Sequence, residues 1–400
     1  MKNLAIYAIH PIMYQVPIFT ELDNAIRSGN RGLTYKVLFG DDLSLRSVFY
    51  KETNTVFKPD TPFLLDGYRH AFLKNWSKDA RSGFLSRINP GIVAEILRNR
   101  YDAILIHGYE SLTAWLAYLT ARAIGTKVLW RGESVLRGDE TVFSWKKKAK
   151  AFVLKRFFAG CDAVLYSCTG NREYLSFYGV PQDKLFSIPC AVNNRFFQEE
   201  RSKWLPQATF IRESLGIRAS DFAVLFSARF TDRKRPFDLI EAAARVKRED
   251  LVLLFVGNGP RKDDMEQRCR ELGVRAVFTG LVNQSEISKY YTVSDTMAVI
   301  SSYDPSPKAM NEAMNFGLPI IVTDVVGTAR DLVSDDGNGF VIRVGDVDAL
   351  ARCLDSLAGD RAKAMAMGRR SLERVETWDY RSDVEGIIEA FNYATGKGMQ

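Results

Sequence analysis

The sequence predicts an α/β protein of two doubly wound domains, each a parallel β-sheet covered by helices. A chain of 400 residues is too long for one compact core, because single cores stop growing at roughly 250 to 300 residues. In both halves, short apolar runs alternate with longer amphipathic stretches, which is the pattern of a parallel sheet with helices on its faces. Two such domains are expected to face each other across a cleft.

Twelve apolar runs are expected to form the strands of the two sheets. In the first half they are Leu4–Ile9, Tyr35–Phe39, Ala103–His107, Lys127–Trp130, Ala163–Ser167 and Leu185–Ile188. In the second half they are Ala223–Ser227, Leu251–Val256, Ala276–Thr279, Thr296–Ile300, Pro319–Val322 and Gly339–Val341.

The domain boundaries are predicted from a change of composition near the middle of the chain. The strip from Asn193 to Ile217 is polar and irregular around Pro206, and we expect the hinge there. The first domain is then residues 1–195 and the second is residues 196–379. A C-terminal helix within residues 380–400 is expected to pack back on the first domain.

The composition is that of a globular protein, with 46% hydrophobic and 26% charged residues. No run approaches the roughly 18 to 20 apolar residues of a membrane-spanning helix, and the N-terminus lacks the apolar core and cleavage site of a secretory signal. The five cysteines are scattered without a CxxC pair, and there are three histidines to ligate a metal. We therefore expect a cytoplasmic protein with reduced cysteines and no metal.

The net charge of +7 indicates attraction to an anionic partner. Much of this charge lies in the segment Trp145–Phe158, where six Lys and Arg residues are mixed with aromatic and aliphatic ones. As a helix the segment is imperfectly amphipathic, since Arg156 falls on the same side as Ala149 and Phe152. Two interpretations stay open, a solvated helix at the edge of a domain and a surface that rests on the inner leaflet of a membrane.

The stretch from Phe49 to Asn89 carries no clear period and is broken by several Pro and Gly residues. Long irregular insertions in α/β domains often form binding loops. An acceptor-binding loop and a plain surface loop are both compatible with this composition.

A basic loop follows the first predicted strand of the second half. The sequence ARFTDRKRPF places Arg229, Arg233, Lys234 and Arg235 beyond the carboxyl end of that strand, where open α/β sheets bind ligands, and Pro236 suits the first turn of a helix. Arg gives bidentate bonds and Lys a mobile point charge, so the pair can grip a diphosphate.

A second loop, SSYDPSPKAMNEAMNFGLPIIVTD, follows another strand and opens on the same edge of the sheet. Ser306 is expected to cap a helix whose first position is Pro307, so that the amides of Lys308 and Ala309 point outward and attract phosphate. Asp304 precedes this helix and Glu312 lies within it, and carboxylates suit sugar and ribose hydroxyls.

These residues resemble retaining glycosyltransferase family 4. The resemblance covers the whole second half, and the residues that carry it are Arg229, Lys234, Gly257 to Pro260, Gly280, Asp304 and Glu312. It implies a GT-B fold of two Rossmann-like domains. The donor that it implies is a nucleotide diphosphate sugar, either a UDP-sugar or a GDP-sugar. It also implies that Arg229 and Lys234 bind the diphosphate and that Glu312 binds the ribose.

The chain departs from the family at two positions of this motif. Asp304 stands where the family has a Glu that contacts the donor sugar, which leaves the choice of sugar open. Pro307 stands where the family usually has a Gly, and the charge of Lys308 is a candidate to compensate.

The first half resembles the family less sharply, and there we expect the acceptor site. The sequence HPIMYQVPIF replaces the family's glycine-rich turn, as in polysaccharide-type members, and offers His10, Tyr14 and Gln15 as acceptor-binding residues. His107 ends a predicted strand and matches a family His that reaches the donor sugar, so we count it with Asp304, Arg229 and Lys234 as catalytic. Arg131 and Glu133 follow the next strand and are further acceptor-binding candidates.

Two other signals are rejected. Gly257 and Gly259 imitate a dinucleotide-binding fingerprint, but Lys262 occupies the third glycine position. Asp346 and Asp348 form a D-x-D pair of the kind that binds metal in other glycosyltransferases, but they precede a helix, so capping explains them better.

The expected function is transfer of a sugar with retention of configuration, without a metal or other cofactor, to a glycan or lipid-linked acceptor in cell-surface polysaccharide or lipopolysaccharide synthesis. Three alternatives remain. A nucleotide-sugar epimerase would need acid and base residues that the sequence does not offer, and a phosphorylase-like enzyme would need a cofactor lysine. A non-enzymatic basic binding protein, for example for nucleic acid, is disfavoured because the phosphate-binding residues gather at one sheet edge.

Overall fold

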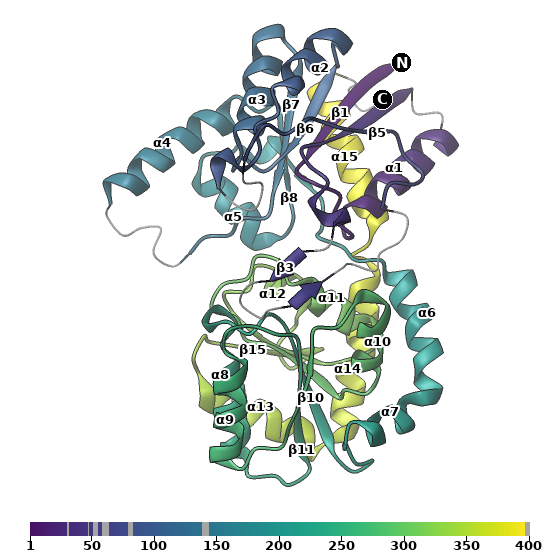
Figure 1. The fold of residues 1–400 in the computed structure, drawn as a ribbon, viewed down its shortest axis with the longest axis vertical. Helices are drawn as coiled ribbons and strands as arrows, with labels where there is room; N and C mark the ends of the chain where they lie inside the picture. Colours follow the sequence, from purple (N-terminus) through teal and green to yellow (C-terminus); the bar gives the residue numbers. More distant parts are fainter. Residues whose placement is uncertain are drawn as a thin grey trace. The chain divides into compact units, whose positions relative to one another are not determined.

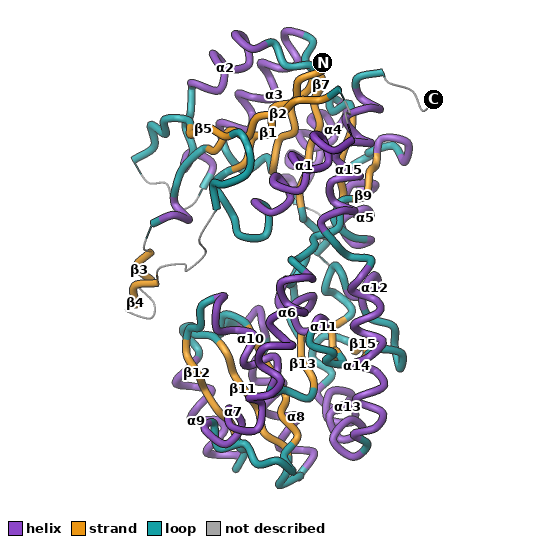
Figure 2. Tube along the Cα trace, turned by 90° about the vertical axis from the view of Figure 1, so that its right-hand side faces the viewer, coloured by secondary structure: helices purple, strands orange, loops and turns teal. Residues whose placement is uncertain are grey.

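The computed structural model describes residues 1–29, 32–46, 48–50, 55–57, 64–78, 83–137 and 144–396, and the chain folds into two compact units (Figure 1). The first unit comprises Met1–Val48, Thr61–Cys190 and Tyr380–Gln400, and the second comprises Phe49–Asp60 and Ala191–Asp379. In each unit the strands of the main sheet form an inner layer with helices outside it (Figure 2). The predicted fold class is confirmed.

The first unit is built on a seven-stranded sheet of order β5-β2-β1-β6-β7-β8-β9, in which neighbouring strands run parallel. The strands are β1 (Lys2–Ala8), β2 (Leu33–Phe39), β5 (His70–Phe72), β6 (Ala103–His107), β7 (Lys127–Gly132), β8 (Ala163–Tyr166) and β9 (Leu185–Ser187). All six strands predicted for this half are present. The edge strand β5 was not predicted, because three residues are too few to show a period.

Helices cover both faces of this sheet. They are α1 (Val16–Gly29), α2 (Gly91–Asn99), α3 (Leu112–Ile124), α4 (Trp145–Ala159), α5 (Thr169–Phe177) and α15 (Tyr380–Ala394). Helices α2 to α5 share a core with Tyr7, Ile106 and Trp130 of the strands. Helix α15, yellow in Figure 1, packs against α1, β8 and β9. It approaches closely at Gly386, where a Cβ atom would lie 1.9 Å from the carbonyl oxygen of Ser187.

The second unit is built on a six-stranded parallel sheet of order β12-β11-β10-β13-β14-β15. The strands are β10 (Phe222–Ser227), β11 (Leu251–Val256), β12 (Ala276–Gly280), β13 (Thr296–Val299), β14 (Ile320–Thr323) and β15 (Gly339–Ile342). All six were predicted. They are nearly continuous apolar runs, as expected of parallel strands that are buried on both faces.

The helices of the second unit are α6 (Asn194–Trp204), α7 (Ala208–Ser214), α8 (Pro236–Val246), α9 (Lys262–Leu272), α10 (Gln284–Thr292), α11 (Lys308–Asn315), α12 (Ala329–Leu332), α13 (Val347–Gly359) and α14 (Arg361–Glu376). Among the described helices, none is long and apolar enough to cross a membrane. The strip Asn193–Ile217 is mostly helical, with α6 against α10 and α11, so its description as irregular was wrong. Asn193 explains why α6 begins at Asn194, since the Asn193 side chain caps the helix by accepting a hydrogen bond from the Phe196 amide at 3.0 Å.

The stretch from Phe49 to Asn89 is only partly described. Strands β3 (Val48–Tyr50) and β4 (Thr55–Phe57) pair with each other as a separate two-stranded sheet. The remainder of the proposed acceptor-binding loop includes residues 51–54, 58–63 and 79–82, which lie outside the described residues.

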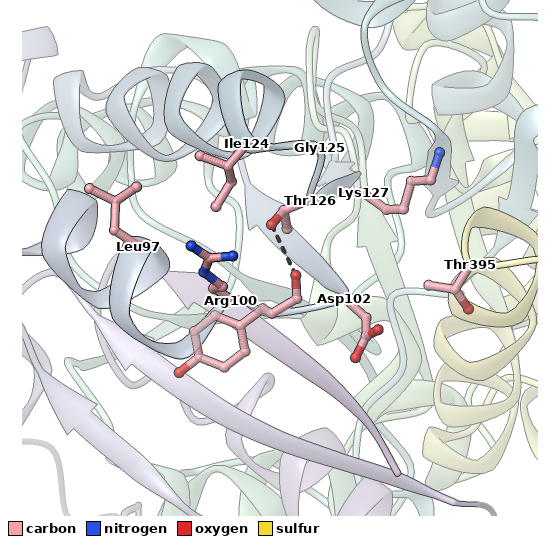
Figure 3. Close-up of a pocket in the computed structure, with 9 residues that line it drawn as sticks. Leu97, Arg100, Asp102, Ile124, Gly125, Thr126, Lys127 and Thr395 are labelled. Atoms are coloured by element: carbon pink, nitrogen blue, oxygen red, sulfur yellow. Dashed lines mark hydrogen bonds between the residues drawn. The ribbon is translucent and has the colours of Figure 1, made fainter.

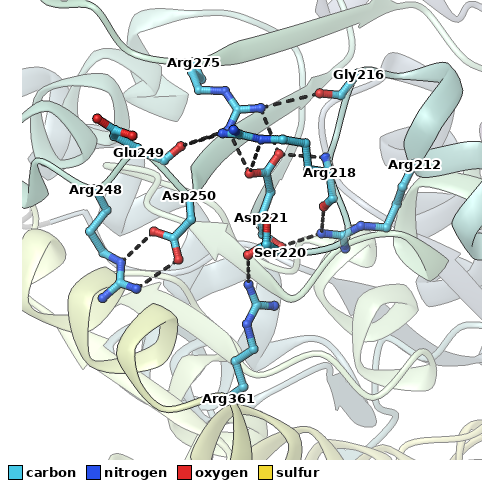
Figure 4. Close-up of polar contacts among 10 residues, drawn as sticks. All are labelled: Arg212, Gly216, Arg218, Ser220, Asp221, Arg248, Glu249, Asp250, Arg275 and Arg361. Carbon is cyan, nitrogen blue, oxygen red and sulfur yellow. Dashed lines mark hydrogen bonds and ion pairs between the residues drawn. The ribbon is translucent and has the colours of Figure 1, made fainter.

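A network of ion pairs fastens the amino-terminal edge of the second sheet (Figure 4). Asp221, which precedes β10, accepts two hydrogen bonds from Arg275 at 2.8 Å each and one from the Arg218 Nε at 3.1 Å. Arg275 lies just before β12, and Arg218 lies in the same loop before β10 as Asp221, so Asp221 ties that loop to the start of β12. This edge is opposite to the edge where the chemistry was predicted.

The strand order places a switch point in each sheet. In the second unit β10 and β13 are neighbours, and their connections leave in opposite directions along the sheet. In the first unit the same relation holds between β1 and β6. Ligands of open α/β sheets bind outside the carboxyl ends of the strands at such points.

Candidate functional site

The basic loop of the second unit follows the carboxyl end of β10, as predicted. Arg229 is exposed, and a short 3-10 turn, Asp232–Lys234, leads to Arg235. Arg235 adopts a left-handed conformation, with φ of 55°, and donates to Asp238 at 2.6 and 3.1 Å. Pro236 is the first residue of α8, as predicted. Asp238 of α8 thus engages Arg235, while Arg229, Arg233 and Lys234 precede it in the loop.

Lys234 and Asp304 meet at the switch point of the second sheet. The Lys234 Nζ atom forms an ion pair with Oδ2 of Asp304, and both side chains are largely buried. The backbone supports this contact, because the amide of Ser302 donates to the carbonyl of Arg233 at 2.8 Å. Two residues that sequence reasoning chose from separate loops are therefore direct partners.

A glycine loop after β11 supports the basic loop from the other side. Gly257 has φ of 137°, and a Cβ atom there would lie 2.1 Å from the carbonyl oxygen of Ala228. The amide of Phe230 donates to the carbonyl of Asn258 at 3.0 Å. Only a residue without a side chain allows the two loops to approach this closely, which explains why glycine stands at position 257.

Helix α11 begins one residue later than predicted. Its N-cap residue is Pro307 instead of Ser306, and no side chain caps it. The Ser306 hydroxyl instead contacts Nζ of Lys308 at 3.2 Å. The first backbone bond runs from the Met310 amide to the Pro307 carbonyl, so the earlier amides of Lys308 and Ala309 point out of the helix start.

Glu312 is buried within the second unit, with 3% of its surface exposed. Its Oε2 atom accepts a hydrogen bond from the Tyr291 hydroxyl at 2.6 Å, and its Oε1 atom lies 3.5 Å from Nε2 of Gln284. Sequence reasoning missed both α10 residues, because no motif marks them. A carboxylate accepts hydrogen bonds and donates none, and α10 supplies a donor to each oxygen of Glu312.

In the first unit, a hollow of about 180 Å³ lies at the carboxyl ends of β1, β6 and β7. It is lined by Ile9, Ile12, Gln15, His107, Gly108, Glu110, Arg131, Gly132 and Glu133. The structure therefore brings together four of the residues predicted for this half. His10 and Tyr14 lie on the same loop as Gln15 but outside this lining.

His107 and Arg131 form the buried part of the hollow. Within the described residues, neither ring nitrogen of His107 has a hydrogen-bond partner. Burial, with a smaller contribution from the positive Arg131, lowers the pKa of His107 to about 3. The ring is thus neutral near pH 7, with one donor and one acceptor for a polar ligand. Burial also lowers the pKa of His10, although the nearby Asp41 carboxylate opposes the shift.

A larger hollow, of about 430 Å³, lies at the amino-terminal edge of the first sheet (Figure 3). Its lining includes Arg100, Asp102 and Lys127, and a hydrogen bond of 2.9 Å joins the Thr126 hydroxyl to the Tyr101 carbonyl. It is lined by none of the predicted residues and lies at the edge where α/β sheets rarely bind substrates. We therefore place the candidate site of the first unit in the smaller hollow, at the carboxyl ends of the strands, although the other hollow is larger.

Of the D-x-D pair, Asp346 has the capping role that was predicted, whereas Asp348 lies within α13 and forms an ion pair with Arg245. Asp346 accepts a hydrogen bond from the Ala349 amide at 2.8 Å at the start of α13. Within the described ranges, no three His, Cys, Asp or Glu side chains gather as metal ligands would.

The chain matches two family models. The one described as "Glycosyl transferases group 1" matches residues 207–374, and the one described as "Glycosyl transferase 4-like domain" matches residues 71–191. Together they cover most of both units.

The curated relatives are distant in sequence. An uncharacterized glycosyltransferase, MJ1607 of Methanocaldococcus jannaschii, is 28% identical over 56% of this chain and 58% of its own length. The UDP-Gal:alpha-D-GlcNAc-diphosphoundecaprenol alpha-1,3-galactosyltransferase of Escherichia coli is 26% identical over 66% of this chain and 68% of its own length. The match thus spans little more than half of the archaeal relative.

Solved structures resemble the whole chain. The Anabaena protein Alr3699/HepE in complex with UDP has a TM-score of 0.71 at 18% identity, covering 98% of this chain and 100% of that one. WaaG, a glycosyltransferase involved in lipopolysaccharide biosynthesis, has a TM-score of 0.63 at 16% identity, covering 98% and 100%. At these identities the likeness establishes the fold alone.

Proposed function

We propose that this chain, which belongs to the family 4 type of glycosyltransferases with a GT-B fold, transfers a sugar from a nucleotide diphosphate sugar to a hydroxyl of its acceptor with retention of configuration. The observation that carries the proposal is the meeting of Lys234, from the loop after β10, with Asp304, from the loop after β13, at the switch point of the second sheet. A UDP or GDP sugar is the expected donor, and UDP is the ligand named for the Anabaena protein of the same fold.

The second unit supplies the groups that a leaving diphosphate needs. Arg229 and Lys234 contribute two positive charges, and the start of α11 at Lys308 and Ala309 contributes outward amides. Asp304 holds Lys234 in place and is also the candidate contact for the donor sugar. Glu312 is the candidate contact for the ribose.

The reaction breaks the bond between the anomeric carbon and the diphosphate oxygen and forms a bond from that carbon to the acceptor oxygen on the same face. The acceptor proton passes to the leaving phosphate oxygen. The protein's part is to stabilise the charge that develops on the diphosphate and to orient the sugar. This route assigns no step to a metal ion, so addition of a chelator is expected to leave the rate unchanged.

The hollow of the first unit is the proposed acceptor-binding site. His107, neutral and buried, offers one hydrogen-bond donor and one acceptor to the donor sugar near its anomeric carbon. Gln15, Arg131 and Glu133 line the same hollow and are candidates for the acceptor, with His10 and Tyr14 on the adjoining loop. Carboxylates and a guanidinium together suit the many hydroxyls of a sugar.

We propose a glycan or lipid-linked acceptor in cell-surface polysaccharide synthesis. The support is the Escherichia coli relative, whose name gives a diphosphoundecaprenol acceptor, and the helix α4. Trp145 and Phe152 of α4 are 71% and 63% exposed among Lys residues, while Leu154, Phe157 and Phe158 face the core. Exposed aromatic and basic residues on one helix suit an anionic lipid surface at the inner leaflet.

The experiment that tests the proposed function is a screen of UDP- and GDP-sugars for protection against thermal unfolding, followed by an assay of sugar release with the best donor. A ligand that binds the native state raises its stability by mass action, about 2.7 kcal/mol at a hundredfold excess over Kd. The proposal requires a selective shift and acceptor-dependent release. A protein that no nucleotide sugar protects would contradict it.

A further inference from the structure

Helix α10 carries two side chains that converge on one buried carboxylate. Gln284 and Tyr291 lie seven residues apart on this helix, close to two turns, and therefore on the same face. Tyr291 donates to Oε2 of Glu312 at 2.6 Å, and Nε2 of Gln284 lies 3.5 Å from Oε1. Helix α10 thus holds a residue of the neighbouring helix α11.

We propose that Tyr291 is a positioning residue that orients the Glu312 carboxylate for the ribose of the nucleotide. The inference rests on the proposed function, in which Glu312 binds that ribose, and it adds the residue that makes this binding specific. Gln284 is its weaker companion at the second oxygen.

The surroundings of Tyr291 suit it to this task. Its side chain is 1% exposed, and its ring packs against that of Phe316, with 5.3 Å between the centroids. The hydroxyl is therefore held at a fixed place by packing, whereas a Glu side chain alone has three rotatable bonds. A carboxylate that is pinned at one oxygen pays less conformational entropy when it accepts hydrogen bonds from two ribose hydroxyls.

Burial makes the contact with Glu312 important as well as directional. Glu312 is 3% exposed, so few water molecules can reach its carboxyl oxygens, and a protein donor has to replace them because an unsatisfied buried polar group is costly. Tyr291 provides that hydrogen bond from inside the protein, since its own side chain is 1% exposed.

The test compares nucleotides that differ only in the ribose hydroxyls. Calorimetry would give the Kd of UDP and GDP, and of their 2′,3′-dideoxy counterparts, for the wild-type protein and for Tyr291→Phe. The Phe ring preserves the packing on Phe316. Tyr290→Phe, at the next position of the same helix, is the matched control, and the melting temperature of each variant would be recorded.

If Tyr291 acts through Glu312 on the ribose, Tyr291→Phe weakens binding of the ribonucleotide about tenfold and leaves the dideoxy nucleotide unchanged. Tyr290→Phe changes neither value. Combining Tyr291→Phe with Glu312→Gln adds no further loss beyond Glu312→Gln alone. Equal weakening of both nucleotides, or no weakening of either, overturns the positioning role.

The two proposals fail separately. If the wild-type protein binds neither UDP nor GDP, the proposed function itself is wrong. If the wild-type protein binds one of them, and Glu312→Gln weakens this binding while Tyr291→Phe does not, only the role of Tyr291 is wrong.

Discussion

Lys234 and Asp304 are ion-paired across the switch point of the second sheet, although 70 residues separate them in the chain. Each stands at the carboxyl end of its own strand, β10 or β13, and these two strands are neighbours. A diphosphate that enters this place competes with Asp304 for the charge of Lys234. The carboxylate thus keeps the lysine oriented before the donor binds, and the two residues are expected to be energetically coupled.

Replacement of Lys234 or Arg229 by Ala is expected to lower kcat/KM by about 10² to 10³, which is the cost of removing one group that stabilises developing charge. The melting temperature should change little for Arg229→Ala, because that side chain is exposed, and should fall for Lys234→Ala, because this change leaves the largely buried Asp304 without its ion pair. Arg233→Ala is the matched control, because the Arg233 side chain is exposed. Its contact with Ser302 is a hydrogen bond to the backbone carbonyl, which the substitution keeps. Full turnover in both single variants would remove the donor site from this loop.

The length and charge of residue 304 are expected to have separable effects. Asp304→Asn removes the negative charge beside Lys234 and should reduce transfer from every donor sugar. Asp304→Glu keeps the charge and moves it outward by one methylene, so it should change the ranking of donor sugars more than the best rate. The measurement is kcat/KM over a panel of nucleotide sugars, and an unaltered ranking in Asp304→Glu would mean that this residue does not contact the sugar.

The strands and the meeting of Lys234 with Asp304 were predictable for one physical reason. Parallel strands that are buried on both faces are apolar runs, and loops after their carboxyl ends must open on the same edge. Two such loops, each with polar side chains, therefore converge whenever their strands are neighbours. The same reasoning gathers Gln15, His107, Arg131 and Glu133 in the first unit.

What the sequence could not predict depends on contacts between distant elements. Tyr291 looks like any buried aromatic residue of an amphipathic helix, and only the fold, in which α10 and α11 both pack against α6, makes it a partner of Glu312. Ser306 has the ordinary chemistry of a helix cap, but its hydroxyl contacts Lys308 and the helix starts after Pro307. The strip around Pro206 was expected to be irregular, yet helices α6 and α7 flank that proline.

His107 is expected to make stability depend on pH. Its pKa is about 3 in the folded chain and about 6.5 when exposed, so the unfolded state binds the extra proton. The contribution of neutral His107 to the free energy of unfolding is complete above about pH 6.5 and is lost as the pH falls toward 3. At pH 5 the free energy of unfolding is lower by about 2 kcal/mol for this reason. Urea unfolding at pH 7.5 and pH 5 should differ less in His107→Gln than in the wild type. Equal differences would mean that His107 is accessible to protons in the folded protein.

Two interpretations of helix α4 can be tested, a solvated surface helix and a helix that contacts a membrane. If it rests on anionic lipid, the protein should co-sediment with vesicles containing phosphatidylglycerol and not with pure phosphatidylcholine vesicles. Lys148→Glu combined with Lys150→Glu should weaken that binding at least tenfold, since each basic residue near such a surface contributes about 1 kcal/mol. Both side chains are exposed, so the fold should be kept, and transfer to a water-soluble acceptor should be unchanged. Binding that is insensitive to these charges would favour the solvated helix.

Asp221 is expected to stabilise the second unit without contributing to the reaction. Its side chain is fully buried, and the hydrogen bonds from Arg275, with support from Arg218, hold the pKa of the carboxyl at about 2 although burial opposes this. Because the folded-state pKa is below the unfolded value of about 3.9, its contribution is present above pH 4 and is lost as the pH falls toward 2.

Asp221→Asn should lower the free energy of unfolding by about 2 to 3 kcal/mol, less than for a wholly buried pair because both arginines are partly exposed. Asp348→Asn is the control, since its pair with Arg245 is exposed on both sides and should contribute less than about 1 kcal/mol. Urea unfolding at pH 7 measures both. At a temperature where Asp221→Asn is folded, its kcat and donor KM should equal those of the wild type, because Asp221 lies at the amino-terminal edge of the sheet and Lys234 and Asp304 lie at the carboxyl edge. A changed donor KM would show that the two edges of this sheet are coupled.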